Sequence, residues 1–127
     1  MSEYVLDASA VLALLNQEPG HNKVAPLLSQ SVLSSINLCE VLGKLIDAGI
    51  AASEANQTVG LLGMPIVPFD AVLALTTAEL RTDTRSLGLS LGDRSCIALA
   101  RNRDATADTA ERLWSKLKLG VPIEVIR

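Results

Sequence analysis

Four acidic residues stand at points along this 127-residue chain where a strand ends or a helix begins. Asp7 ends the apolar run YVL, and Asp93 opens the helical stretch LSLGDRSC. Glu40 lies in the first turns of a helix in SSINLCEVLGKL, and Glu111 follows a strand-like run in ATADTAERLW. Because the carboxyl ends of parallel strands and the beginnings of the following helices share one edge of a sheet, we expect these four side chains to meet there.

Four carboxylates gathered at one place need a cation or protons. Two carboxylates ~6 Å apart repel one another by about 3 kcal/mol at an effective dielectric constant near 20, and four carboxylates make several such pairs. Oxygen ligands of this kind suit Mg²⁺ or Mn²⁺. A divalent ion with open coordination positions binds phosphate oxygens and activates water, so the pattern favours phosphodiester hydrolysis.

The elements that would position these acids alternate between strand and helix. Five runs are predicted as strands: Glu3–Leu6, Ser31–Leu33, Pro65–Pro68, Ala105–Asp108 and Ile123–Ile126. The helical patterns between them predict five helices. The first begins at Ser9, the second runs from Ile36 to about Asp47 and is capped by Ser35, and the third covers roughly Glu54 to Leu62. The fourth covers Ala71–Arg81 and is capped by Asp70, and the fifth begins with Ser90 and Asp93 at capping-box spacing. Pro26 should break the helical stretch HNKVAPLLSQ. The alternation predicts a single α/β domain over residues 1–127, with a mainly parallel sheet of about five strands and helices on both faces.

Composition narrows the class of protein. Apolar residues make up 49% of the chain and aromatic residues only 2%, so the core must be aliphatic. The chain is long enough to form one hydrophobic core without stabilising disulfides or metal ions. Cys39 and Cys96 match no metal-site spacing and are interpreted as small buried hydrophobes of a reducing compartment. The start, MSEYVLDAS, lacks the basic region of a signal peptide, and we expect a cytoplasmic protein without a membrane span.

The net charge of −3 conceals an asymmetry along the chain. Residues 1–80 contain two lysines against eight acids, whereas residues 81–127 contain nine lysines and arginines against six acids. This distribution permits phosphate contacts at one side of an acidic pocket, although a solvated helical surface would have the same composition.

The ordered set of these motifs resembles the PIN-domain family, and within it the VapC-type ribonuclease toxins of bacterial toxin–antitoxin pairs. The stretches that carry the resemblance are YVLDASAVLALL, SSINLCEVLGKL, IVPFDAVLALTTAEL, TRSLGLSLGDRSCIALA and TAERLW, which together span nearly the whole chain. The resemblance implies an Mg²⁺- or Mn²⁺-dependent endoribonuclease that leaves a 5′-phosphate and a 3′-hydroxyl. It also implies a homodimer inhibited by a cognate antitoxin whose tail covers the acidic pocket.

Carried onto this chain, the family's metal-binding and catalytic acids become Asp7, Glu40 and Asp93, with Ser9 and Asn37 as supporting polar residues. The fourth acid is expected just after TA, where Glu111 stands in place of the usual aspartate. Asp108 lies just upstream, where an apolar strand residue is expected, and becomes the ligand instead if the strand ends earlier.

Other interpretations remain open for several of these residues. Asp93 at capping-box spacing from Ser90 is by itself typical of a helix start. Trp114 is interpreted as a core or interface anchor rather than a base-stacking platform. The departure at Glu111 keeps open a second function, a PIN-scaffold module that binds RNA or protein with little or no catalysis, and a phosphatase acting on small molecules would use the same acids.

Overall fold

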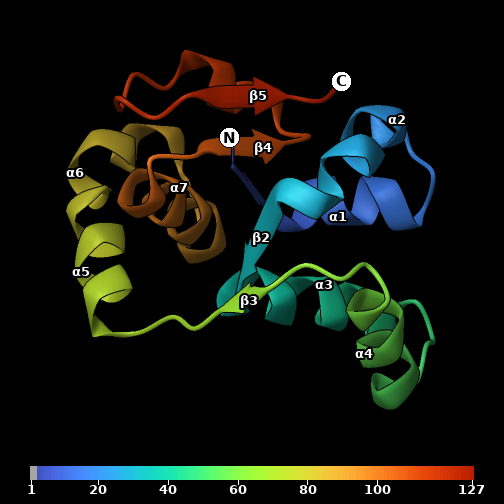
Figure 1. The fold of residues 1–127 in the computed structure, drawn as a ribbon. Helices are drawn as coiled ribbons and strands as arrows, with labels where there is room; N and C mark the ends of the chain where they lie inside the picture. The colour runs from blue at the N-terminus through green and yellow to red at the C-terminus, as the bar shows by residue number, and fades with distance from the viewer. Residues whose placement is uncertain (1–2) are drawn as a thin grey trace.

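Five parallel strands form one sheet in the order β3-β2-β1-β4-β5, in a computed structural model that describes residues 3–127 (Figure 1). The strands are β1 (Tyr4–Leu6), β2 (Ser31–Ser34), β3 (Ile66–Val67), β4 (Thr106–Thr109) and β5 (Ile123–Val125). Each lies within two residues at either end of the predicted run. The predictions of an α/β fold and a parallel sheet are confirmed.

Helices cover both faces of this sheet, as the alternation of elements predicted (Figure 1). On one side lie α1 (Ala8–Leu15), α2 (His21–Val24), the 3₁₀ helix η1 (Ala25–Gln30), α3 (Ser35–Asp47) and α4 (Ala52–Gly60). On the other lie α5 (Ala71–Glu79), α6 (Arg81–Thr84) and α7 (Leu91–Arg103). Two further 3₁₀ helices, η2 (Arg85–Leu87) and η3 (Arg112–Lys116), complete the set that the described residues form.

The two faces of the sheet bury separate apolar clusters, because neighbouring residues of a strand point to opposite faces. On the side of α1 to α4, Leu6 of β1 belongs to a cluster that includes Val11, Leu33, Val41 and Ile126. On the side of α5 and α7, Val5 belongs to a cluster that includes Ile97, Leu99 and Trp114. The core is almost entirely aliphatic, and Trp114 is a core anchor at 1% exposure, as predicted.

The connections place a crevice at the end of the central strand. The chain leaves β1 toward β2 on one side and returns to pair with the other side of β1 as β4. Such a switch point opens the carboxyl ends of the two strands to a ligand. Asp7 follows β1 at this point, and its backbone N–H donates to the carbonyl oxygen of Asp108 in β4 at 3.0 Å.

The helix that carries Glu40 is capped by a different serine from the one predicted. Ser34, the last residue of β2, has extended backbone angles, and its Oγ accepts a hydrogen bond from Asn37 N at 3.1 Å. Ser35 is already helical, and its Oγ accepts from Phe69 N at 3.0 Å. The prediction of Ser35 as the cap was wrong because two consecutive serines have the same capping chemistry, and only the end of β2 selects between them.

The remaining helix starts lie close to the predictions. Asp70 caps α5, and Ser90 and Asp93 form a capping box at α7, both as predicted. The first helix begins at Ala8 rather than Ser9, because Asp7 itself is the cap. Near Pro26, α2 ends at Val24 and the chain continues as η1, whose first turn tolerates proline since no helical N–H bond is required there.

The two cysteines differ in environment. Cys96 is buried in α7, as predicted, but Cys39 is exposed, so that part of the prediction was wrong. The buried face of α3 repeats every four residues through Asn37, Val41 and Leu45, and Cys39 lies about half a turn away from it. No helix among residues 3–127 is long and apolar enough to cross a membrane. The single-domain prediction for residues 1–127 stays a prediction, and its first two residues, Met1 and Ser2, lie outside the described part of the chain.

Candidate active site

A cavity of about 240 Å³ opens at the carboxyl edge of the sheet, where α3 and α7 begin. All four predicted acids line it: Asp7, Glu40, Asp93 and Glu111. Ala8, Ser9, Leu12 and Lys44 complete the lining. The topology therefore brings together side chains that are separated by up to about a hundred residues in the sequence.

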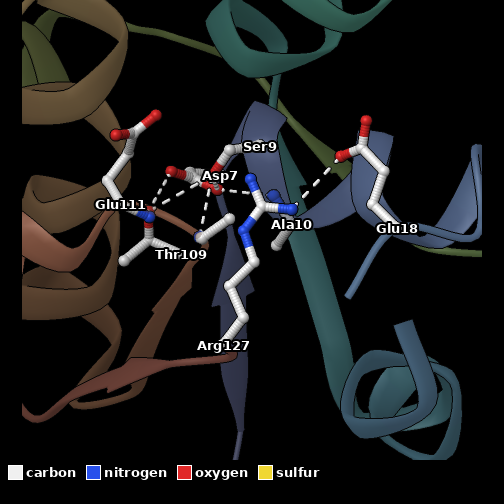
Figure 2. Close-up of polar contacts among 8 residues, drawn as sticks. Asp7, Ser9, Ala10, Glu18, Thr109, Glu111 and Arg127 are labelled. Carbon is white, nitrogen blue, oxygen red and sulfur yellow. Dashed lines mark hydrogen bonds and ion pairs between the residues drawn. The ribbon is translucent and has the colours of Figure 1, made fainter. Parts of the chain in front are cut away.

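Three hydrogen bonds hold the carboxylate of Asp7, as Figure 2 shows. Its Oδ1 accepts hydrogen bonds from Ser9 Oγ at 2.7 Å and from Ala10 N at 2.8 Å, and its Oδ2 accepts from Thr109 Oγ1 at 2.6 Å. Burial raises the pKa of Asp7 to about 6, and the three hydrogen bonds oppose that rise because they stabilise the charged form. The result is a buried carboxylate with a single orientation.

Glu40 is positioned by Asn37, one turn earlier on α3. Asn37 Nδ2 donates to Glu40 Oε1 at 2.8 Å and to the Gly92 carbonyl oxygen at 3.1 Å, and Asn37 Oδ1 accepts from Ser34 Oγ at 2.9 Å. The buried Asn37 therefore ties the start of α3 to the start of α7. Gly92 makes room for Glu40, since a Cβ at that position would lie 2.2 Å from Glu40 Oε2.

Asp93 belongs both to the capping box of α7 and to the lining of the acidic cavity. Its Oδ2 accepts from Ser90 N at 3.0 Å and its backbone N–H donates to Ser90 Oγ at 3.1 Å, which is the reciprocal pattern of a capping box. The same side chain lines the acidic cavity. A capping role uses one carboxylate oxygen and leaves the other for a ligand, so the two interpretations do not compete.

Glu111 lines the cavity, and Asp108 does not. In the parallel pairing of β1 and β4, Asp108 is opposite Leu6, so the two side chains point to the same face of the sheet. Asp7, the next residue after Leu6, points to the other face, together with Thr109. The strand continues through Thr109, and the chain then turns so that Glu111 comes to the cavity.

Asp108 is instead an acid enclosed within the sheet. It is fully buried, and neither of its carboxylate oxygens has a hydrogen-bond partner among the described residues. Burial, with the nearby carboxylates of Glu124 and Asp7, raises its pKa to about 7. Asp108 therefore lies in an environment suited to an apolar side chain, which is the residue type that the sequence pattern predicts at this position.

Two residues that support the site were missed in the sequence. Thr109 Oγ1 reaches Asp7, and the Glu111 backbone N–H donates to the same Thr109 hydroxyl at 3.0 Å. Gly92 provides the space for Glu40. Thr109 could have been predicted as a hydroxyl residue at the end of the strand that pairs with β1, but only if β1 and β4 were already known to be neighbours.

The donor set suits a hard divalent cation, although the side chains are not yet gathered around one point. No group of three or more histidine, cysteine or acidic side chains within residues 3–127 is arranged to hold a metal ion as it stands. Each of Asp7, Glu40 and Asp93 accepts hydrogen bonds from a different neighbour, namely Thr109, Asn37 and Ser90. The acidic side chains of the cavity supply oxygen ligands, which are the ligands that Mg²⁺ and Mn²⁺ prefer.

Comparisons with known proteins agree with this architecture. The sequence profile of the PIN domain matches residues 4–119. The fold is similar to that of DNA-bound VapBC from Salmonella typhimurium (TM-score 0.74, 21% identity, 98% of each chain covered) and of a toxin–antitoxin complex from Klebsiella pneumoniae (TM-score 0.74, 18% identity, 98% of each chain covered). It is also similar to VapBC-5 from Mycobacterium tuberculosis (TM-score 0.64, 22% identity, 100% of this chain and 99% of that chain covered). A comparison with curated protein sequences gave no match.

Proposed function

Since the chain belongs to the PIN domain family, we propose that it is a metal-dependent endoribonuclease and the toxin of a toxin–antitoxin pair. PIN domains generally use divalent metal ions. The observation that carries the proposal is the single cavity into which the fold gathers Asp7, Glu40, Asp93 and Glu111. Asp7 and Asp93 also cap helices, but capping does not require four carboxylates around one cavity, where each adds to the repulsion among the others.

The four acids and the residues that hydrogen-bond to them have different tasks in this proposal. Asp7 and Asp93 are the principal ligands of Mg²⁺ or Mn²⁺, and Glu40 and Glu111 bind it directly or through water. When bound, such an ion activates water and stabilises the leaving oxygen of the phosphodiester. Ser9 and Thr109 keep Asp7 oriented, and Asn37 does the same for Glu40.

The proposed biological role rests on the proteins whose structures are similar to this fold. The similar structures from Salmonella, Klebsiella and Mycobacterium are complexes or members of toxin–antitoxin systems. We therefore propose a cognate antitoxin as protein partner and RNA as substrate, with a homodimer as the assembly that the family resemblance implies.

The test is cleavage of labelled single-stranded RNA by the purified chain, with Mn²⁺ or with EDTA. The wild type should cleave only with Mn²⁺, whereas Asp7→Asn and Asp93→Asn should not cleave. Asp104→Asn is the matched control, since Asp104 is exposed at the opposite end of α7 and has a left-handed backbone that asparagine tolerates.

A second measurement separates loss of metal from loss of fold. Mn²⁺ should raise the Tm of the wild type and of Asp104→Asn, with a gain of about 2.7 kcal/mol in unfolding free energy at a hundredfold excess over the Kd, but not that of Asp7→Asn. Retained cleavage in both Asp7→Asn and Asp93→Asn would refute the site. RNA binding by the wild type without cleavage under any divalent metal would support the binding module instead.

A further inference from the structure

A second cavity, of about 360 Å³, adjoins the acidic one and shares part of its wall. Ser9, Leu12 and Lys44 line both cavities, so the two adjoin along this wall, and together they are called the groove. Beyond this shared wall the second cavity is lined by Asn16, Glu18, Leu45, Ala48, Ile50 and Arg127. The acidic cavity therefore continues into a region with a different charge.

Two cations face this groove. Lys44 lies one helical turn after Glu40 on α3, at the junction of the two cavities, and within residues 3–127 it makes no ion pair. Arg127 Nη1 lies 3.4 Å from Glu18 Oε1, with both side chains more than a third exposed. Such an exposed and long pair contributes at most about 1 kcal/mol, so the guanidinium is available to another anion.

Arg127 lines the second cavity together with Ser9, and Figure 2 shows both residues. Ile126, the preceding residue, is 1% exposed, and its N–H donates to the Thr109 carbonyl oxygen at 2.9 Å. Thr109 is the residue whose hydroxyl holds Asp7. Thr109, the last residue of β4, therefore contacts Asp7 through its hydroxyl and the residue before Arg127 through its carbonyl oxygen.

We propose that Lys44 and Arg127 form a phosphate-binding subsite for the RNA strand on one side of the bond to be cleaved, an inference that rests on the proposed function. A strand entering a cavity with four carboxylates is repelled wherever its phosphates are not neutralised. Lys44 supplies a point charge next to the cavity, and Arg127 supplies a planar donor suited to phosphate oxygens. The groove gives the strand a path from the acidic cavity to both cations.

The experiment is the salt dependence of kcat/KM for cleavage of a labelled single-stranded RNA with Mn²⁺, for wild type, Lys44→Met and Arg127→Gln. Each variant should raise KM about tenfold with little change in kcat. Each should also reduce the slope of log kcat/KM against log salt by about 0.7, the value for one lost phosphate contact on a single strand. Lys44→Arg should keep the wild-type slope, because it keeps the charge.

Matched controls are Lys118→Met and Arg101→Gln. Arg101 Nη2 donates to the Leu119 carbonyl oxygen near the C-terminal end of α7, which places Arg101 and Lys118 far from Asp93 at its other end. Both controls should keep the wild-type KM and slope. A parallel measurement of RNA binding in EDTA by fluorescence anisotropy should rank the variants in the same order without any cleavage.

The outcomes separate this inference from the proposed function. If the wild type cleaves RNA but Lys44→Met and Arg127→Gln keep its KM and slope, the subsite is overturned and the nuclease stands. A fall in kcat at unchanged KM, or an equal loss in the two controls, also overturns it. If the wild type neither cleaves nor binds RNA, the proposed function fails and the subsite fails with it.

Discussion

Replacing Gly92 by alanine should displace Glu40 without unfolding the protein. The added Cβ would lie 2.2 Å from Glu40 Oε2 and 2.4 Å from Cδ and Oε1. Because carbon contacts are comfortable only at about 3.5 Å, the carboxylate must retreat by roughly 1 Å. Glu40 is an exposed, flexible side chain, so it can move into solvent and abandon its hydrogen bond from Asn37.

We expect Gly92→Ala to change the stability of the protein little and to lower its activity strongly. Alanine is favoured over glycine within a helix by about 0.5–1 kcal/mol, which offsets part of the loss of the Asn37–Glu40 hydrogen bond, so the unfolding free energy should change by no more than about 1 kcal/mol. A displacement of about 1 Å at a reacting centre lowers the rate by roughly a hundredfold. Gly92→Ala should therefore cleave RNA about a hundredfold more slowly and need more Mn²⁺.

The assay is the cleavage rate against Mn²⁺ concentration, with urea denaturation as the measure of folding. Gly43→Ala is the matched control, since Gly43 is a helical glycine of α3 whose added Cβ would meet nothing within 4 Å. Glu40→Asp shortens the side chain and relieves the contact, so adding it to Gly92→Ala should cost less activity than it costs in the wild type. Wild-type rate and Mn²⁺ dependence in Gly92→Ala, or losses that simply multiply in the double variant, would refute the reasoning.

Two further predictions concern the acids of the last part of the chain. Glu111→Gln should raise the Mn²⁺ concentration needed for cleavage, and Glu111→Asp should leave activity equal or better; a wild-type metal titration for Glu111→Gln would remove Glu111 from the site. For Asp108 the sign follows from its pKa, which is about 7 in the folded protein against an ordinary value of 3.8. Between pH 4 and 7 the unfolded chain has lost a proton that the folded chain keeps, so the free energy of unfolding falls by roughly 4 kcal/mol as pH rises through this range. Asp108→Val should therefore stabilise the protein by several kcal/mol at pH 7.5 and less at pH 5, with cleavage retained, and urea denaturation in EDTA that shows no gain at pH 7.5 would contradict this account.

Much of the fold could be predicted from local patterns in the sequence. The run YVL followed by Asp7 indicated a buried strand with an acid at its end, and the capping box of Ser90 and Asp93 indicated the start of α7. These features depend on residues a few positions apart, so the chain displays them directly. Parallel pairing followed from the alternation of strands and helices, and it was enough to predict that the strand-end acids lie on one edge.

Only the tertiary structure decided which side chains line the acidic cavity and which contact its acids. Which of Asp108 and Glu111 lines the acidic cavity depends on the register of β4 against β1, because a shift by one residue would move every side chain of the strand to the opposite face. Thr109 under Asp7 and the gap at Gly92 are contacts between segments about fifty to a hundred residues apart. No short-range pattern in the sequence records such contacts, since they arise only when the packed sheet and helices bring those segments together.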